Sequence, residues 1–313
     1  MNRSKLISLL ICISLLLSAI VLLASCDSGK EMDNNTTTTQ EETTTAIEET
    51  TDSTPKEKVE YTLTFVSEGK LSLANVEFEV YSDEGMTSLK AYNETNKTGK
   101  ATIKLTEGET YYVKVISAPD GYKFEESYTL TDRETSITLK SYLREDAPTG
   151  NFAYQLGDVV HDFVLTGSGD NAIKVSDVLD QYGCVIINLW YIGCSPCRAE
   201  FPYIQSAYNA YSDKVGFYAL NGNAMDSDSA IADFMSQNGY TFPTGKADSL
   251  LLQNFGITAF PTTIVIDKYG VVCLLETGAV PEEAPFVNMF EFFSNPNYSE
   301  TTLFPNIEYI PAK

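Results

Sequence analysis

The alternation of hydrophobic and polar residues divides the chain into regions of different character. Residues 6–23 form an uncharged apolar run, residues 27–58 are almost entirely polar, and short apolar runs return from residue 59. Up to residue 142 these runs alternate with period two, which predicts strands because successive side chains of a strand point to opposite faces. The clearest runs are 61–65, 76–81, 101–105, 111–115 and 136–139. With turn residues between them, including a hairpin turn at 107–109, they predict a small antiparallel β-sandwich.

From residue 152 the pattern changes, because apolar runs now alternate with segments whose apolar residues recur every three or four positions, as in an amphipathic helix. The predicted strands are 162–166, 172–175, 184–191, 215–220, 263–267 and 270–276, and the predicted helices are 195–211, 227–238, 248–255 and 283–293. Strands alternating with helices predict an α/β sandwich. Strand 184–191 is apolar on both faces, as in the centre of a sheet, and only Asn188 interrupts it. A polar side chain there needs a hydrogen-bond partner.

The apolar run near the N-terminus follows Arg3 and Lys5, in the manner of a secretory leader. It ends in Leu-Ala-Ser-Cys at residues 23–26, which resembles the bacterial lipobox. That resemblance implies cleavage before Cys26 and attachment of diacylglycerol to its sulfur, on the outer face of the cytoplasmic membrane, as in Gram-positive bacteria. The alternative is an uncleaved signal anchor, because eighteen residues just span a bilayer. In either case we expect the rest of the chain to face outward.

Composition and charge restrict the partners of the mature protein. The chain has 313 residues, 43% of them hydrophobic, which suffices for two domains with cores. Its net charge is −22, and −24 without the leader, which argues against nucleic acid as a partner. Residues 27–58 hold ten threonines, nine acids and three lysines, a composition that predicts a disordered, self-repelling tether.

The segment Cys194-Ser195-Pro196-Cys197 lies where the apolar strand gives way to a helix. Two thiols with this spacing at a helix start can close a small disulfide and act as a redox pair. Cys194 faces the unpaired N–H groups and the positive end of the helix dipole, so its thiolate is favoured. Pro196 suits the first turn of a helix and limits flexibility between the sulfurs. We expect Ser195, Pro196 and Asn188 to tune the redox balance.

Glu200 follows Cys197 by three residues, so the two side chains are neighbours on the helix. On the apolar stripe of the helix, the carboxyl would lie partly buried beneath the disulfide. Burial and a nearby thiolate would both raise its pKa, which makes Glu200 a candidate proton donor and acceptor for Cys197. The alternative is a solvated acid in the first turn, favoured by the helix dipole.

Phe260-Pro261-Thr262 precedes a second apolar strand, and together with the cysteine motif it resembles the thioredoxin superfamily. The resemblance implies a cis peptide bond before Pro261 and a backbone at Phe260 that pairs with an extended substrate. Asn-Leu-Trp at residues 188–190, followed by Cys-Ser-Pro-Cys-Arg-Ala-Glu-Phe-Pro, is similar to the TlpA/ResA-like oxidoreductases. In those proteins an Asn replaces the buried Asp of thioredoxins and the acid stands in the helix, where this chain has Glu200. The same resemblance implies that Trp190 contributes to substrate binding.

Two positions depart from that family pattern. Gly193 stands where a Trp usually precedes the first cysteine, which predicts a more open surface over the disulfide. His161, the only histidine of the chain, replaces a proline, and we interpret it as structural.

The resemblance implies a thiol-disulfide oxidoreductase that acts outside the cytoplasm. Cys194 would attack a disulfide of a protein substrate and Cys197 would resolve the mixed disulfide, with no cofactor beyond this cysteine pair. A membrane electron donor similar to CcdA would keep the pair reduced. Partners would be proteins with disulfides or thiols, such as apocytochromes c, sporulation or wall proteins, or a methionine sulfoxide reductase.

Other functions are possible for parts of this sequence. A thiol peroxidase with an antioxidant role is one alternative, and a surface binding or adhesion protein whose sandwich does the work is another. A zinc site needs about four ligands, and one cysteine pair with one distant histidine does not supply them. Cys184 and Cys273 either pair with each other or remain free and buried, and their apolar strands favour free thiols.

The β-sandwich resembles the CnaB or prealbumin-like domains of Gram-positive surface proteins, on the order of its strands and turns. Many such domains carry a Lys–Asn crosslink, but Thr62 and Thr64 stand where the lysine is expected, so we predict that it is absent. We interpret the domain as a spacer or docking surface. The predicted organisation is a leader at 1–25, lipidated Cys26 with its tether to 58, the sandwich at 59–142, a linker at 143–151, the thioredoxin-like domain at 152–295 and a tail at 296–313.

Overall fold

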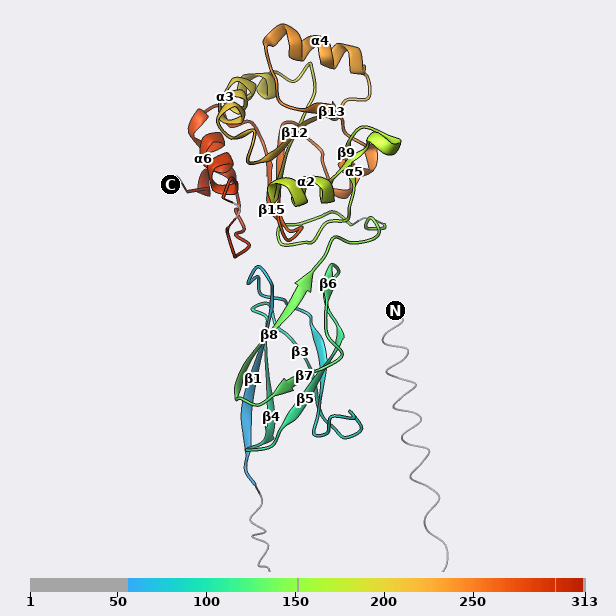
Figure 1. Ribbon diagram of the computed structural model, residues 1–313, viewed down its shortest axis with the longest axis vertical. Coiled ribbons are helices and arrows are strands. Elements are labelled where there is room, and N and C mark those ends of the chain that lie inside the picture. Colours follow the sequence, from blue (N-terminus) through green and yellow to red (C-terminus); the bar gives the residue numbers. More distant parts are fainter. Residues whose placement is uncertain (1–55, 151, 296, 312–313) are drawn as a thin grey trace, which may run out of the picture. The chain divides into compact units, whose positions relative to one another are not determined.

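The structure, a computed structural model, describes residues 56–150, 152–295 and 297–311. The predicted leader, Cys26 and nearly all of the tether lie outside these residues. The described chain contains a β-rich region followed by an α/β region (Figure 1). Both kinds of region were predicted from the sequence pattern, and their order along the chain is confirmed.

The β-rich region consists of two four-stranded sheets. Their orders are β4-β1-β8-β6 and β3-β2-β5-β7. The strands are β1 Lys58–Ser67, β2 Glu77–Tyr81, β3 Leu89–Glu94, β4 Lys100–Thr106, β5 Tyr111–Ser117, β6 Tyr122–Lys123, β7 Tyr128–Leu130 and β8 Glu134–Ser141. Neighbouring strands run antiparallel except β1 and β8, which are parallel. The prediction of a wholly antiparallel sandwich is therefore wrong at this pair, whose strands are far apart in sequence and not constrained by a hairpin.

Alternation in β1 sets the core of this region. Tyr61, Leu63 and Phe65 are buried between the sheets, while Thr62 and Thr64 are half-buried on the other face of the strand. Burying these large side chains removes apolar surface from water, which stabilises the sandwich.

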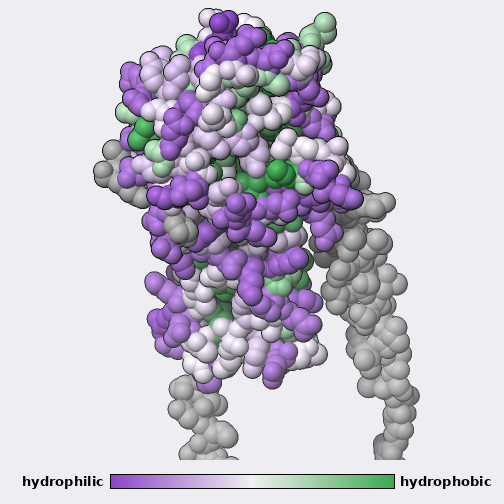
Figure 2. Space-filling view, turned by 45° about the horizontal axis from the view of Figure 1, so that its top comes forward, coloured by the Kyte–Doolittle hydropathy of each residue, from purple (hydrophilic) through white to green (hydrophobic). Residues whose placement is uncertain are grey.

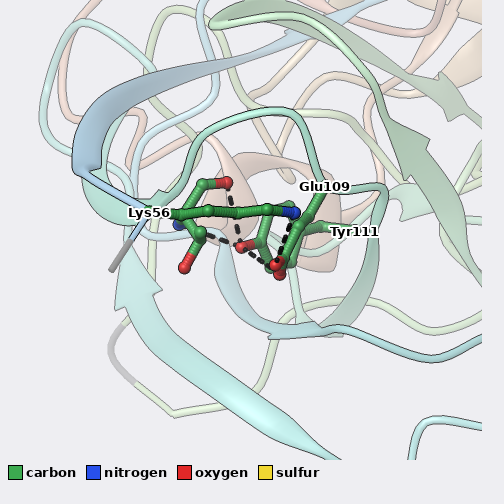
Figure 3. A network of polar contacts seen from close by, with 4 residues as sticks. Lys56, Glu109 and Tyr111 are labelled. Atoms are coloured by element: carbon green, nitrogen blue, oxygen red, sulfur yellow. Dashed lines mark hydrogen bonds and ion pairs between the residues drawn. The ribbon is translucent and has the colours of Figure 1, made fainter. Parts of the chain in front are cut away.

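The turn at 107–109 is not a hairpin, contrary to the prediction. The strand before it, β4, belongs to one sheet and the strand after it, β5, to the other. The Tyr111 hydroxyl accepts a hydrogen bond from the Thr106 amide at 2.9 Å and also contacts Glu109, which pairs with Lys56 (Figure 3). These polar contacts tie the crossover to the end of the sandwich.

The α/β region is built around a five-stranded sheet of order β13-β12-β11-β14-β15. Its strands are β11 Cys184–Trp190, β12 Gly216–Asn221, β13 Thr244–Lys246, β14 Thr262–Asp267 and β15 Val272–Thr277, and β9 Val164–Thr166 pairs separately with β10 Ile173–Lys174. The helices are α2 Val175–Tyr182, α3 Ser195–Tyr211, α4 Asp228–Asn238, α5 Ser249–Asn254 and α6 Glu283–Phe293, with short 3-10 turns η1 Gly169–Asn171 and η2 Ile307–Tyr309. Helices α3 and α6 lie side by side and pack together (Figure 1).

Two elements of this region were missed. Helix α2, which follows β10 directly, was not predicted. The sequence did carry signals for it, because Val175, Val178 and Leu179 have helical spacing and Gly183 ends the helix in the left-handed conformation. The strand predicted at 172–175 wrongly included Val175, which is the first residue of that helix. Strand β13 has three residues, too few for a period to be recognised.

Strand β11 divides its side chains between the two faces of the sheet. Val185, Ile187 and Leu189 join one apolar cluster, while Ile186 and Trp190 join the cluster that contains α3 and α6. Because side chains alternate along a strand, Asn188 lies on the α3 face. The sheet therefore brings the one polar residue of its central strand beneath the helix that carries the cysteine pair.

Hydrophilic residues predominate on the face of the molecule shown in Figure 2, and hydrophobic residues form only small patches there. No helix within the described ranges is both long and apolar enough to cross a membrane.

Candidate active site

The cysteine pair lies at the junction of β11 and α3, as the sequence predicts. Cys194 and Cys197 form a disulfide, and their Cα atoms are 5.3 Å apart. Cys194 is the N-cap of α3, and its sulfur accepts a hydrogen bond from the backbone N–H of Cys197 at 3.1 Å. The first cysteine thus faces the unpaired amides of the helix start, where negative charge on sulfur is stabilised once the disulfide is reduced.

The two sulfurs differ in their depth below the surface. Cys197 is fully buried, and Cys194 is 2% exposed but flanked in the chain by the exposed residues Gly193 and Ser195. Pro196 is also exposed, in the first turn of α3. Cys194 therefore lies just below an exposed loop, while Cys197 is completely enclosed.

The Glu200 carboxyl is enclosed in the protein on the inner side of α3. Its side chain is 1% exposed, so the alternative of a solvated acid in the first turn is wrong. Oε1 accepts a hydrogen bond from Asn188 Nδ2 at 2.8 Å, and Oε2 accepts one from the Val280 amide at 3.1 Å. Burial raises the pKa of Glu200 to about 7, although both hydrogen bonds oppose the rise. At neutral pH this carboxyl can both take and give a proton.

Asn188 has the partner that its burial requires. Besides Glu200, its Nδ2 group contacts Thr263 Oγ1 at 3.3 Å, on the neighbouring strand β14. Asn188 and Thr263 face each other in the register of β11 and β14, so the sheet itself brings the amide and the hydroxyl together.

The loop before β14 has the backbone expected from the sequence. The peptide bond between Phe260 and Pro261 is cis. The Pro261 carbonyl accepts a hydrogen bond from the Gly278 amide at 2.9 Å, which ties this loop to residues 277–282. Phe260 is half-buried, and its ring packs edge-on against Tyr191 with 5.6 Å between ring centroids. The two aromatic rings form one wall beside the cysteine loop.

Trp190 does not lie where a substrate could touch it. Its side chain is fully buried, with ring centroids 4.9 Å from Phe201 and 5.2 Å from Phe234. The prediction that it binds substrate directly is therefore wrong. The alternation of β11 turns this side chain into the core under α3, where it supports the helix.

One residue at this site was missed by sequence reasoning. Asp226, in the loop after β12, accepts hydrogen bonds from the Ile192 amide and from Asn221 Nδ2, each at 2.9 Å. The carboxylate thereby holds the loop that leads into Cys194. A run of polar residues directly after a buried strand was a usable signal, because strand ends of a sheet gather at one edge.

The remaining candidate residues lie away from the cysteine pair. His161 is buried, and its Nδ1 is 2.8 Å from the Tyr154 hydroxyl, which fits the structural role predicted for it. Cys184 and Cys273 are free and buried, which confirms the favoured alternative for them. Among the described residues, no group of His, Cys, Asp and Glu side chains is placed to hold a metal ion.

Comparison with known proteins divides the chain at the same place as the fold. Residues 155–290 match the family model described as Redoxin. Residues 60–145 match the SpaA model, described as a prealbumin-like fold domain.

Curated relatives are similar to the α/β region. The chain is 31% identical over 137 residues to the thiol-disulfide oxidoreductase ResA of Geobacillus kaustophilus, covering 43% of this chain and 76% of that protein. It is 30% identical over 127 residues to ResA of Bacillus subtilis, covering 40% of this chain and 69% of that protein. Among solved structures, the thioredoxin domain of a Bacteroides vulgatus oxidoreductase is 21% identical, covers 46% of this chain and 100% of that chain, and superimposes with a TM-score of 0.38.

Proposed function

Because the chain belongs to the ResA family of thiol-disulfide oxidoreductases, we propose that it reduces disulfide bonds of proteins outside the cytoplasm while anchored to the membrane through Cys26. The observation that carries the proposal is the combination of an N-cap cysteine, Cys194, with a buried carboxyl, Glu200, one helical turn beyond Cys197. Cys194 meets the amides of the helix start, and Glu200 has a pKa of about 7.

The reaction begins from the reduced pair. The Cys194 thiolate attacks one sulfur of the substrate disulfide, forming a mixed disulfide and releasing the other substrate sulfur as a thiolate. Cys197 then attacks Cys194, which closes the disulfide seen in the structure and releases the second substrate sulfur. Two electrons pass from the cysteine pair to the substrate, and a reductant must return them before the next cycle.

In the second step, Glu200 takes up the proton that Cys197 loses. Cys197 must lose its proton before it can attack, and it lies in an apolar site where water is excluded. A carboxylate one turn away on the same helix accepts that proton, and a pKa near 7 lets it do so without holding the proton too tightly.

The wall formed by Tyr191 and Phe260 is the proposed docking edge for substrate. Both rings are half-buried and border the cysteine loop, and the cis peptide bond lies directly after Phe260. An extended substrate would pair with the backbone at Phe260, next to Cys194. Ser195 and Pro196, exposed between the two cysteines, would set the redox balance together with Asn188.

The proposed location rests on the sequence of the N-terminal region. The basic residues, the apolar run and the lipobox-like segment at 23–26 support secretion and lipidation, and the acidic tether would hold the domains away from the membrane. A membrane electron donor similar to CcdA would return electrons to the pair. The prealbumin-like domain would act as a spacer or docking surface.

Exchange of cysteine for serine tests the proposal. We expect Cys194→Ser to abolish reduction of insulin, and Cys197→Ser to trap protein partners as mixed disulfides with Cys194. Unchanged insulin reduction by Cys194→Ser would overturn the enzymatic role and favour a binding function of the sandwich. The redox potential tests the direction, because a value below about −270 mV indicates a reductant and one near about −120 mV an oxidant.

A further inference from the structure

The hydrogen bonds around Glu200 suit only one of its two charge states. Both groups that contact the carboxyl, Asn188 Nδ2 and the Val280 amide, are donors. Donors stabilise a carboxylate, but a carboxylic acid carries a proton that needs an acceptor. A proton on either oxygen would face a donor, so the neutral acid is poorly accommodated by the arrangement as it stands.

The missing acceptor belongs to Asn188 itself. Its Oδ1 atom is buried and has no hydrogen-bond partner within the described part of the chain. A buried, unpaired amide oxygen costs free energy and is uncommon in folded proteins. It lies on the same planar group as the Nδ2 that contacts Glu200, so a half-turn about the Cβ–Cγ bond exchanges the two atoms.

We propose that the Asn188 amide rotates by a half-turn when Glu200 takes up a proton, so that one side chain donates to the carboxylate and accepts from the acid. This inference rests on the proposed function of the site and assigns Asn188 as a positioning residue for the proton of Glu200. The proton resides on Oε1, because Oε2 keeps its hydrogen bond from the Val280 amide in both states.

The hydroxyl of Thr263, the second partner of the Asn188 amide, can bond to the amide in both orientations. In the orientation seen, its Oγ1 accepts from Asn188 Nδ2. A hydroxyl is both donor and acceptor, so after the half-turn the same Oγ1 donates to Oδ1. The amino group then takes the position of the unpaired oxygen, and one unpaired atom is exchanged for another of nearly the same size.

Most of the charged groups on the surrounding elements are exposed, but Glu276 shares the sheet face of Asn188 and Thr263. On α3, Arg198 is exposed and lies over the Phe234 ring. Glu276 on β15 is half-buried, lies opposite Thr263 in the register of β14 and β15, and interacts with Glu308. The exposed Glu283 at the start of α6 bonds to Ser206. Glu282, which precedes α6, is exposed. Cys197 lies one turn before Glu200 on the same helix, and Glu276 is the titratable group that faces Thr263.

The rotation accompanies the second step of the reaction. The Cys197 thiol gives its proton to Oε1 of Glu200, and its sulfur forms a bond with Cys194 while the bond from Cys194 to the substrate breaks. The substrate sulfur leaves with the electron pair of that bond. Asn188 turns to accept from the new acid, and it returns when the acid gives up its proton.

Nuclear magnetic resonance of the full chain in detergent, labelled in its asparagine and glutamate side chains, tests the rotation without any substrate. The carboxyl carbon of Glu200 reports its titration, and the Nδ2 protons of Asn188 report the orientation through their contacts with the Thr263 methyl group. We expect these contacts at pH 9 and their loss at pH 5, with the same midpoint as the carboxyl. Contacts that persist at both pH values, while Glu200 titrates, would overturn the proposal.

Variants give an independent readout in the same spectra. In Glu200→Gln the Val280 amide holds the new carbonyl, the new amino group faces Asn188, and we expect the rotated orientation at every pH. Thr263→Ser keeps the hydroxyl that pairs with the amide in both orientations, so we expect the pH-dependent change in the Asn188 resonances to persist in that variant. Contacts of the Asn188 Nδ2 protons with the Thr263 methyl group in Glu200→Gln, at either pH, would overturn the proposal. Since none of these measurements involves turnover, they fail or succeed separately from insulin reduction.

Discussion

At each end of the central sheet lies a group of two cysteines and one buried carboxyl. Only one of these two groups has the features of a redox site. At one end are Cys194, Cys197 and Glu200. At the other, Cys184 on β11 and Cys273 on β15 lie near Asp267 on β14. Burial raises the pKa of Asp267 as it does that of Glu200, so a thiol pair and a perturbed acid do not by themselves make an active site.

Topology explains why the second pair remains unlinked. Strand β14 lies between β11 and β15, so Cys184 and Cys273 are two strands apart. Two strand spacings separate the backbones by roughly 10 Å, beyond the reach of a disulfide without movement of the backbone. Cys194 and Cys197 avoid this problem because both lie in one turn at the start of a helix.

Electrostatics separate the two ends as well. Burial raises the pKa of Cys184 to about 12 and that of Cys273 well above its usual value, so both stay protonated at neutral pH. At the other end the amide of Cys197 points at the Cys194 sulfur. The comparison shows that a cysteine becomes reactive here because it lies at the start of a helix and just below the surface.

The largest effect should come from removing one cysteine at each end. We expect Cys194→Ser to lose insulin reduction completely, whereas Cys184→Ser and Cys273→Ser reduce insulin at the rate of the unaltered protein. Turnover assays with equal amounts of folded protein, judged by circular dichroism, provide the measurement. Loss of activity in Cys273→Ser would break the distinction between the two ends.

The two acids should differ next. We expect Glu200→Gln to slow exchange about 10²-fold and to flatten the dependence on pH near 7, because it removes the proton acceptor for Cys197. Asp267→Asn should leave the rate per folded molecule unchanged, since Asp267 contacts the Tyr269 and Val271 amides, the Thr301 hydroxyl and the Cys273 thiol, and not the redox pair. Exchange rates of both variants, measured from pH 5 to pH 9, test this difference. An equal slowing in both variants would contradict the role of Glu200 as the proton acceptor.

Stability should respond to pH through the same carboxyl. The pKa of Glu200 rises from 4.5 in the unfolded chain to about 7 in the folded one, so the folded state binds the proton more tightly. This contribution is fully present below pH 4.5 and is lost as pH rises through 7, at a cost of up to about 3 kcal/mol.

Glu200→Gln cannot ionise, so at pH 8 we expect it to be the more stable protein by up to that amount. Urea unfolding at pH 5 and pH 8 measures the difference. Glu283→Gln, at an exposed acid on α6, serves as the control and should behave alike at both pH values. Equal stability of Glu200→Gln and the unaltered protein at pH 8 would show that the folded site ionises Glu200 without penalty.

The smallest effect concerns the loop that leads into Cys194. Asp226→Ala removes the carboxylate that accepts from the Ile192 amide, a loss of about 2 kcal/mol for a hydrogen bond to a charged group. We expect faster hydrogen exchange at Ile192 and a shifted redox potential. Asp233→Ala, at an exposed position of α4, should change neither. Unaltered exchange at Ile192 would show that the loop is held by other contacts.

Local patterns were sufficient for much of the fold and for the reactive pair. The helix at 195–211 was predicted with its observed bounds, because Pro196 and the recurring apolar residues act within the helix itself. Turn 107–109 and the parallel pairing of β1 with β8 were predicted incorrectly, because the choice of partner strand depends on contacts across the sandwich.

The surroundings of Glu200 show the same division. Its place one turn after Cys197 follows from sequence spacing, and so does the expectation of burial. Val280 contacts Glu200 from 80 positions away in the sequence, and Thr263 contacts Asn188 from 75 positions away, and no local signal marks either residue. Trp190 was misjudged for a similar reason, since the face it occupies is set by the sheet.

The sequence by itself determined the two kinds of domain, the cysteine pair at a helix start and the acid one turn below, because these depend on residues a few positions apart. Only the tertiary structure decided which donors hold that acid and which cysteines can meet. Hydrogen bonds and disulfides act over a few ångströms, and the pairing of strands distant in sequence brings their atoms within that range.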